Sequence, residues 1–149
     1  HLGCGTETHL FPMRRLAPLL LLMLLCACRH ETPCTVSIGP SDFSIDPNTD
    51  ANYAALFHPG GYVYLTGGHR GIVVIRTALH EFVAYERTCP CDNDSRVVMS
   101  TEWSGLLECP TCHTLFDAYN FGTPMEGAAT PCPLYPYSTL YQGGVLHIY

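Results

Sequence analysis

The chain has 149 residues, no lysine and a formal net charge of -6 at pH 7, a size that fits one domain. Binding to nucleic acid depends on clustered Lys and Arg, so this composition excludes a phosphate-neutralising surface, and nucleic acid is not an expected partner. Charged residues make up only 13% of the chain, and its many Thr, Ser, Gly, Pro and Tyr residues favour strands and turns, which predicts a small all-β domain.

The first part of the chain has the pattern of an export signal. A Met-Arg-Arg sequence at 13–15 precedes a stretch at 16–25 that is apolar apart from one proline. This stretch is shorter than the ~20 residues of a membrane span, but it has the length of a signal-peptide core. It ends in Leu-Cys-Ala-Cys, which resembles the bacterial lipobox, whose final cysteine is lipidated. The alternative, a buried leucine-rich helix, is disfavoured because no polar face appears at helical spacing.

These features predict where the mature protein begins. We expect residues 1–28 to be an upstream extension and a lipoprotein signal peptide, with Cys28 as the lipidated residue. The protein would then be exported and anchored through its lipid in the bacterial cell envelope, on the periplasmic side or in the outer membrane. Residues 29–52, rich in Pro, Ser, Thr and Asp, are expected to be a tether with one short strand at 35–38, and residues 53–149 to be the folded domain.

The folded domain is predicted to contain strands and turns. Runs rich in Val, Ile and Tyr flank a Gly-Gly turn and predict a two-stranded hairpin. Residues 81–87 alternate with period two, which predicts a strand with two different faces. Trp103 and the tyrosines at 135, 137 and 141 are expected to pack in the core. Strands are expected at 62–65, 72–76, 81–87, 96–99, 106–108, 137–141 and 145–149.

Nine cysteines in a chain of this length indicate disulfides in an oxidising compartment or a metal site. Four of them form two close pairs, Cys89-Pro-Cys91 and, 17 residues later, Cys109-Pro-Thr-Cys112. Two short loops that each present two thiolates are typical of a metal site, because soft thiolates bind zinc or iron-sulfur clusters. Zinc sites generally have about two to four residues between paired ligands, so the single residue between Cys89 and Cys91 favours a two-iron cluster.

The cysteine pairs and the sequence after them resemble the Rieske-type ferredoxin-like domain family. That family carries C-x-H, an intervening stretch and C-P-x-H-G-x-x-F-D, then a Gly-Pro-Ala loop and a Pro-Leu run into two closing strands. Here Cys-Pro-Thr-Cys-His-Thr-Leu-Phe-Asp occupies 109–117, Gly-Ala-Ala-Thr-Pro occupies 127–131 and Pro-Leu-Tyr occupies 133–135. The resemblance extends from about residue 61 to the C-terminus. It implies an all-β, Rieske-like β-sandwich or barrel with a small rubredoxin-like metal-binding subdomain.

Cysteine replaces both histidine ligands of the family. Cys91 and Cys112 stand at the two histidine positions, so the resemblance implies that Cys89 and Cys109 bind one iron and that Cys91 and Cys112 bind the other. An all-thiolate [2Fe-2S] cluster is more negative than one with two neutral imidazoles, and extra negative charge resists reduction. The potential should therefore lie toward the roughly -400 mV of all-cysteine ferredoxins, away from the Rieske range of about -150 to +300 mV.

Neighbouring residues are predicted to support or replace these ligands. Thr114 stands where high-potential members of the family place a hydroxyl donor to the cluster, and the resemblance implies that the loop from Gly127 to Pro131 shields the cluster. His113, one residue past the family's ligand position, is the main alternative ligand, since zinc or iron would accept its imidazole.

The sequence leaves three states of the four cysteines open. The first is a [2Fe-2S] cluster, which would require export of a folded protein, and the twin arginine at 14–15 is only part of the signal for that route. The second is a bound zinc. The third is a pair of disulfides, Cys89 with Cys109 and Cys91 with Cys112, in a chain that crosses the membrane unfolded.

These observations predict a membrane-anchored electron-transfer protein that carries a [2Fe-2S] cluster and exchanges electrons with a partner protein. The alternative is a cluster-free lipoprotein with a structural or binding role, stabilised by zinc or disulfides. An enzyme is not expected, because no combination of nucleophile, base and orienting group stands out and an oxygenase would need a separate catalytic iron domain. Whether Cys34 and Cys132, the other two cysteines of the mature chain besides the lipidated Cys28, form a disulfide is left open.

Overall fold

The computed structural model describes residues 33–149, and residues Cys34–Tyr149 form one compact unit. The predicted signal peptide and its lipidated Cys28 lie outside the described residues. Among residues 33–149, no helix is long and apolar enough to cross a membrane. The compact unit begins at Cys34, so it includes most of the segment 29–52 that was expected to be a tether.

Antiparallel strands make up most of the regular structure, so the predicted all-β class is confirmed. A short 3-10 helix, η1 (Ala51–Leu56), precedes the second strand. The strands are β1 (Phe43–Ile45), β2 (Tyr62–Leu65), β3 (Ile72–Ala78), β4 (Glu81–Glu86), β5 (Val98–Met99), β6 (Leu106–Glu108), β7 (Leu115–Asp117), β8 (Thr123–Pro124), β9 (Pro136–Tyr137), β10 (Thr139–Gln142) and β11 (Val145–Ile148).

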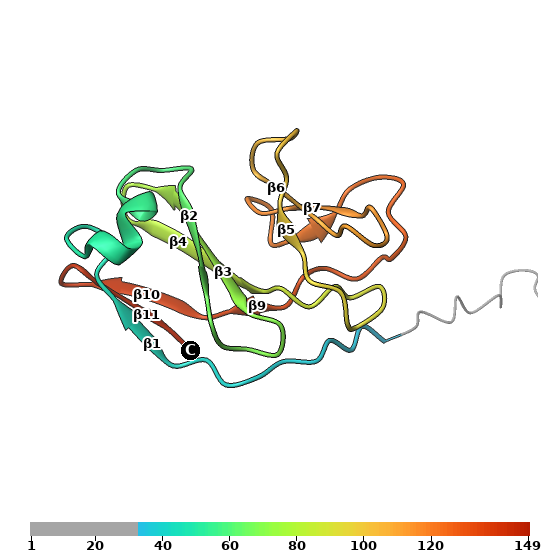
Figure 1. Cartoon of the computed structure of the whole chain (residues 1–149), viewed down its shortest axis with the longest axis horizontal. Coiled ribbons are helices and arrows are strands. Elements are labelled where there is room, and N and C mark those ends of the chain that lie inside the picture. Colours follow the sequence, from blue (N-terminus) through green and yellow to red (C-terminus); the bar gives the residue numbers. More distant parts are fainter. Residues whose placement is uncertain (1–32) are drawn as a thin grey trace, which may run out of the picture. The chain divides into compact units, whose positions relative to one another are not determined.

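The unit contains three sheets, which form a larger body and a smaller subdomain (Figure 1). The larger body is a sandwich of two sheets, one with the strand order β1-β11-β10 and the other with the order β2-β3-β4-β9. The third sheet, β5-β6-β7-β8, is inserted between β4 and β9 in the sequence. One cysteine pair precedes β5 and the other lies between β6 and β7. This is the Rieske-like arrangement that was predicted, a β-sandwich with a small cysteine-bearing subdomain.

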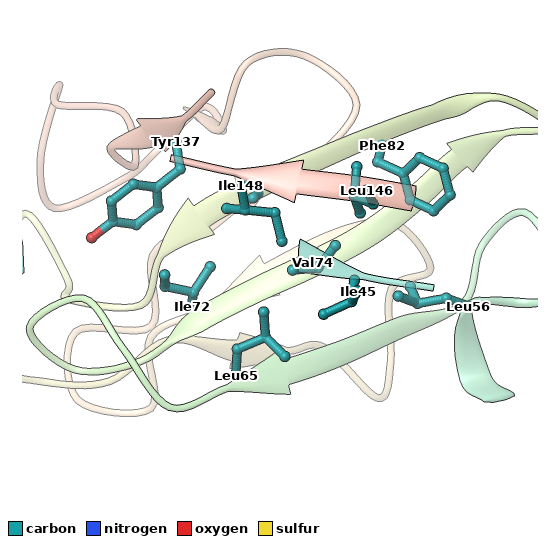
Figure 2. Close-up of a cluster of buried hydrophobic side chains, with 10 residues drawn as sticks. Ile45, Leu56, Leu65, Ile72, Val74, Phe82, Tyr137, Leu146 and Ile148 are labelled. Atoms are coloured by element: carbon teal, nitrogen blue, oxygen red, sulfur yellow. The ribbon is translucent and has the colours of Figure 1, made fainter. Parts of the chain in front are cut away.

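Alternation along β3 and β4 places every second side chain in the core between the two sheets of the sandwich. Ile72 and Val74 of β3 and Phe82 of β4 pack there with Leu146 and Ile148 of β11 (Figure 2). This pattern confirms the strand predicted from the period-two alternation of β4. The other buried members of the cluster are Ile45, Leu56, Leu65, Ala84 and Tyr137.

The opposite face of the same strands packs against the small subdomain. Val73 and Ile75 of β3 and Tyr85 of β4 belong to a second buried cluster. The sheet β2-β3-β4-β9 is thus covered on both faces at β3. This explains why residues 72–75 of β3 are all apolar, whereas a half-exposed strand would alternate apolar and polar residues. The small subdomain and the segments next to it contribute Cys89, Val97, Leu107, Cys109, Phe116, Ala118 and Leu134. The first cysteine of each pair is therefore part of a hydrophobic core.

Several strands differ from the prediction, and β7 and β8 were not predicted at all. The N-terminal strand is β1, whereas residues 35–38 have no strand structure. Phe43 of β1 pairs with Ile148 of β11, so a partner at the far end of the chain stabilises this strand. The strand predicted at 137–141 is divided at Ser138, because β9 pairs with β4 while β10 pairs with β11. Ser138 thus marks the point where the chain passes from one sheet of the sandwich to the other.

Two aromatic side chains lie on the surface, and the prediction that they pack in the core is wrong. The side chain of Trp103 is 57% exposed and that of Tyr135 is 38% exposed. Tyr137 is buried in the first cluster as predicted, and Tyr141 packs partly buried against it. The small subdomain therefore presents its tryptophan to solvent.

A buried carboxylate fixes the loop between β2 and β3. Glu86 is fully buried, and its oxygens accept hydrogen bonds from the backbone N-H groups of His69 (2.7 Å), Arg70 (2.9 Å) and Thr88 (3.1 Å). The hydroxyls of Thr88 (2.9 Å) and Tyr137 (2.7 Å) also donate to this carboxylate. Five donors thus satisfy a charge that would otherwise be costly to bury.

Replacing Glu86 by Gln is expected to destabilise the protein at neutral pH and to weaken its response to acid. Burial by itself raises the pKa of Glu86, but hydrogen bonds from the N-H groups of Arg70 and His69 and from the hydroxyls of Tyr137 and Thr88 lower it below the ordinary value of 4.5. The stabilisation by this carboxylate is therefore complete above about pH 4.5 and is lost as the pH falls through the lower pKa of the folded state. Urea denaturation at neutral pH should show a loss of about 1.5–3 kcal/mol in the Glu86→Gln protein.

Glu102→Gln is the matched control, because it makes the same chemical change at an exposed position. It should leave the free energy of unfolding within about 0.5 kcal/mol of that of the parent protein. If the Glu86→Gln protein loses as much stability as the parent when the pH falls from neutral to about 3.5, then Glu86 does not contribute to the acid response.

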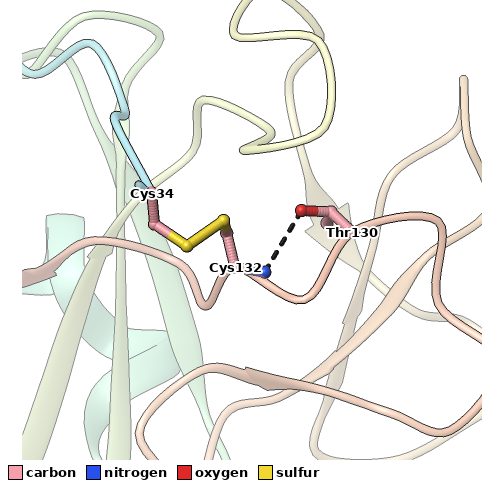
Figure 3. Close-up of a disulfide and its surroundings, with 3 residues drawn as sticks. All are labelled: Cys34, Thr130 and Cys132. Atoms are coloured by element: carbon pink, nitrogen blue, oxygen red, sulfur yellow. Dashed lines mark hydrogen bonds between the residues drawn. A yellow bond between two sulfur atoms is a disulfide. The ribbon is translucent and has the colours of Figure 1, made fainter. Parts of the chain in front are cut away.

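A disulfide ties the start of the compact unit to the segment after the small subdomain (Figure 3). Cys34 and Cys132 are bonded with their Cα atoms 5.4 Å apart, and the N-H of Cys132 donates to Oγ1 of Thr130 at 3.1 Å. Nearby, the N-H of Ser37 donates to Oδ1 of Asn93 at 2.6 Å, and the Asn93 amide donates to Oγ of Ser37 at 2.8 Å. These contacts hold the first residues of the unit against the first cysteine loop and the last loop of the subdomain.

Candidate metal centre

The two cysteine pairs lie in turns that have the same backbone hydrogen bond. The N-H of Asn93 donates to the C=O of Cys89 at 2.8 Å, and the N-H of His113 donates to the C=O of Cys109 at 2.8 Å. In each turn the donor is the fourth residue after the first cysteine and has a positive φ, +57° at Asn93 and +58° at His113. The two loops therefore share one turn geometry although their cysteine spacings differ.

The spacing within each pair determines how deep the second thiol lies. Cys89 and Cys109, the first cysteines of the two turns, are fully buried. Cys112 follows three residues after its partner and is half-buried, whereas Cys91 follows only two residues after its partner and is exposed. The four thiols thus extend from the hydrophobic core to the surface.

Three of the four predicted ligands lie close together. The Sγ atoms of Cys89, Cys109 and Cys112 are all within 4.8 Å of one another, and those of Cys89 and Cys112 are 3.7 Å apart. Cys91 stands outside this trio, and its thiol interacts with that of Cys112. All four are free thiols, so the two disulfides considered between these loops are not formed.

Burial and hydrogen bonding make the thiols of Cys89, Cys91 and Cys112 unequal as acids. Burial raises the pKa of Cys89, and burial together with the neighbouring Cys112 raises that of Cys91. Burial by itself would raise the pKa of Cys112 too. Hydrogen bonds from the hydroxyl and N-H of Thr114 and from two neighbouring thiols outweigh this effect and lower the pKa to about 7. Of these three thiols, Cys112 is therefore the one most readily ionised near neutral pH, and the thiolate is the form that binds a metal.

Thr114 connects the second turn to the loop that was predicted to shield the site. Thr114 is buried, and its Oγ1 lies 3.2 Å from Sγ of Cys112. The same oxygen accepts a hydrogen bond from the N-H of Ala129 at 3.1 Å, which leaves the hydroxyl proton for the sulfur when Cys112 is ionised. Gly127 and Pro131 are exposed positions of this loop, and Ala129 makes the contact.

His113 turns away from the thiols. Its side chain is 78% exposed, and its Nδ1 lies 3.7 Å from Oε1 of Glu108. Its positive φ corresponds to the glycine that the family has at this position, where the chain turns tightly. In this structure His113 therefore contributes the backbone N-H that closes the turn, and its imidazole ring is not one of the groups gathered around the thiols.

The donor set suits a soft metal centre. Thiolates favour zinc and iron-sulfur clusters over hard cations. The 3.7 Å between the sulfurs of Cys89 and Cys112 is close to the roughly 3.8 Å edge of a tetrahedron with metal-sulfur bonds of about 2.3 Å. Cys91, beside Cys112, offers a fourth thiol at the rim. The residues present thus fit a metal held by thiolates.

Three further residues shape the site without being singled out by the sequence patterns. Ser37 and Ala129 act through hydrogen bonds that link distant segments, so no local pattern marks them. Asn93 carried a usable signal, because asparagine tolerates a positive φ and stands four residues after Cys89, as His113 does after Cys109.

No family model and no curated protein matches this chain. Among solved structures, the ferredoxin of carbazole 1,9a-dioxygenase from Nocardioides aromaticivorans IC177 is similar, with a TM-score of 0.46 and 19% identity over 75% of this chain and 97% of that one. A structure described as the complex of reduced oxygenase and oxidized ferredoxin in carbazole 1,9a-dioxygenase matches with a TM-score of 0.43 and 21% identity, over 60% of this chain and 81% of that one.

Proposed function

We propose that this protein is an exported electron carrier that holds a [2Fe-2S] cluster on Cys89, Cys91, Cys109 and Cys112. The main support is that two loops with the same turn bring three of these sulfurs within 4.8 Å of one another, with the fourth thiol beside Cys112. When bound, such a cluster accepts and releases one electron at a time. The proposal gives the chain no catalytic site of its own, and its redox partner is another protein.

The four cysteines and Thr114 would have different roles in binding such a cluster. Cys89 and Cys109 would anchor it to the hydrophobic core, since both are fully buried in the cluster beneath the small subdomain. Cys91 and Cys112 would hold its outer side, where Cys91 is exposed. Thr114 would stabilise the charge on the Cys112 sulfur through its hydroxyl. A partner protein would therefore approach from the side of Cys91.

The metal and sulfide content of the protein tests this proposal. Protein purified anaerobically from its own membrane should be brown and contain about two irons and two sulfides per chain. Cys109→Ser should abolish the colour and the iron, because it removes a buried ligand. Ala118→Ser is the matched control, since it also places a serine hydroxyl in this buried cluster but removes no thiol, and it should leave the iron content unchanged. A protein without metal or free thiols would contradict the proposal.

A single bound zinc is the second candidate. It is favoured by one observation, the 3.7 Å between the sulfurs of Cys89 and Cys112, which are assigned to different irons by the resemblance but fit one tetrahedral metal. In that case the purified protein should be colourless and contain about one zinc per chain. The protein would then have a structural or binding role, because zinc does not change its oxidation state.

Cys28→Ala is expected to release the protein from the membrane fraction and to block processing of the signal peptide. The motivation is the Leu-Cys-Ala-Cys sequence at 25–28, in which Cys28 would carry the lipid. Fractionation and immunoblotting of cells that express the variant measure both effects. Cys26→Ala is the matched control and should be processed and retained like the parent. Unchanged retention of the Cys28→Ala protein would indicate an uncleaved anchor instead.

A further inference from the structure

A cavity of about 340 Å³ lies beside the loop between β2 and β3. Residues 64–71 form much of its wall, and Arg87 and Arg96 complete it. Three of the four arginines among residues 33–149 line this cavity, the third being Arg70 in the loop, and none of its lining residues is acidic. The protein as a whole is acidic, so this concentration of positive charge is local.

The side chain of Arg87 is held in place by its neighbours, but part of its guanidinium forms no hydrogen bond. The residue is only 8% exposed, its Nε donates to the C=O of Val97 at 2.9 Å, and its guanidinium carbon lies 3.6 Å from the ring centroid of Tyr64. The Tyr64 hydroxyl accepts a hydrogen bond from the N-H of Met99 at 2.9 Å, which fixes the ring. The two terminal nitrogens of Arg87 have no hydrogen-bond partner among the described residues. A buried, oriented guanidinium edge is therefore available to a ligand.

A second guanidinium is brought to the same place by the backbone. Thr88 and Arg96 form an isolated antiparallel bridge, and the N-H of Val97 donates to the C=O of Arg87 at 2.7 Å, so Arg87 and Arg96 lie on adjacent segments. Their like charges interact unfavourably. The side chain of Arg96 makes no hydrogen bond or ion pair with the described part of the chain. Two guanidinium groups thus line one cavity, and neither forms a salt bridge with a carboxylate among the described residues.

Arg70 adds a buried donor. Its Nε is buried and has no hydrogen-bond partner among residues 33–149, although its Nη2 is paired with Asp94. A buried N-H group without an acceptor costs about 1–3 kcal/mol, and an acceptor in the cavity would remove that cost. The orphaned Nε is a second observation that points to a missing acceptor.

The nearest buried carboxylate, Glu86, attracts Arg87 electrostatically but forms no hydrogen bond with these guanidinium groups. The oxygens of Glu86 already accept five hydrogen bonds, and they hold His69 and Arg70 in the wall of the cavity. Gly68 in the same wall has a φ of +60°, and a Cβ at this position would collide with Oε2 of Glu86. The hydrogen bonds to Glu86 therefore fix this wall, and the cavity is already formed in the absence of a ligand.

We propose that this cavity binds a small molecule through an oxyanion, either a carboxylate or a phosphate group, held between Arg87 and Arg96 with Nε of Arg70 as a further donor. The planar guanidinium fork matches both kinds of oxyanion, and charge-assisted hydrogen bonds of this type are among the strong ones. The cavity also has the volume of a small-ligand site. No thiol lines the cavity, so this proposal does not depend on the metal centre.

Calorimetric titration of the full chain at low ionic strength tests the proposal, with inorganic phosphate and succinate as separate probes. We expect saturable binding of at least one probe at one site per chain, together with a rise in the melting temperature. The tighter probe identifies whether the natural ligand presents a phosphate or a carboxylate. The proposal is overturned if neither probe binds saturably.

Two variants locate the site. Arg96→Gln should weaken binding at least about fivefold, and because the Arg96 side chain is exposed and unbonded the protein should remain folded. Gln142→Glu, at the exposed end of β10, gives the same net charge and should bind like the parent. Arg87→Lys keeps the charge but loses the fork, and it should also weaken binding. Equal affinities in the Arg96→Gln and Gln142→Glu proteins would show that the probe binds elsewhere and would overturn the proposal.

Discussion

The midpoint potential of the iron-loaded protein is expected to stay nearly constant from about pH 6 to pH 10 and to lie toward roughly -400 mV. In histidine-ligated Rieske centres the imidazole N-H groups lose protons more readily when the cluster is oxidised, so the potential falls as the pH rises. Cys91 and Cys112 stand at those two positions, and thiolates bound to iron have no such proton to lose. Electron transfer should therefore occur without proton transfer.

Voltammetry across this pH interval measures the effect. The double variant Cys91→His, Cys112→His is the matched control, because it restores the family's ligands on the same two turns. Its potential should rise into the range of about -150 to +300 mV and become dependent on pH. A slope in the parent protein that approaches about 59 mV per pH unit, the value for one proton per electron, would show that an imidazole such as that of His113 is an iron ligand.

Loss of the Cys34–Cys132 disulfide is expected to lower the free energy of unfolding by about 2–5 kcal/mol. The bond spans a sequence separation of 98 residues, so it removes much of the conformational freedom of the unfolded chain. It also holds the segment that contains Thr130, next to the loop whose Ala129 contacts Thr114. We therefore expect the double variant Cys34→Ser, Cys132→Ser to unfold at a lower urea concentration than the parent.

The single variants provide the internal control for the disulfide. Cys34→Ser and Cys132→Ser each break the same bond, so each should cost about as much as the double variant. Additive losses would mean that the two side chains stabilise the protein through separate contacts. A double variant within about 0.5 kcal/mol of the parent would contradict the assigned role of the bond.

The sequence was most informative where a local pattern is sufficient. The period-two alternation and turn signals located β2, β4 and β6 within a residue, because each is bounded by turn residues or carries its pattern within itself. β1 was missed because its pairing with β11 is the longest-range contact between strands of the fold. β8 contains Pro124, which argues against a strand in the sequence, yet an edge strand tolerates it.

The sequence predicts which residues form the candidate metal centre, but it does not predict how deeply each thiol is buried. The pairing of Cys89, Cys91, Cys109 and Cys112 follows from their spacing, but spacing does not reveal that Cys91 is exposed while the first cysteine of each pair is part of the core. The arginine-lined cavity gave no signal, because Arg70, Arg87 and Arg96 are separated along the chain. Strand pairing and the buried Glu86 bring them together.

The covalent link at Cys34 also determines how the unit would respond to a mechanical pull. A force applied to the chain at residue 33 enters the unit at Cys34 and crosses the sulfur-sulfur bond directly to Cys132. In a pull between residue 33 and the C-terminus, the covalent path therefore bypasses the chain between these two cysteines, which includes all four thiols of the candidate metal centre. The covalent path continues through β9, β10 and β11, and the pairing of β9 with β4 and of β11 with β1 passes force to the closed loop. We expect these pairings to separate first. The thiols would thus keep their spacing while the C-terminal strands gave way.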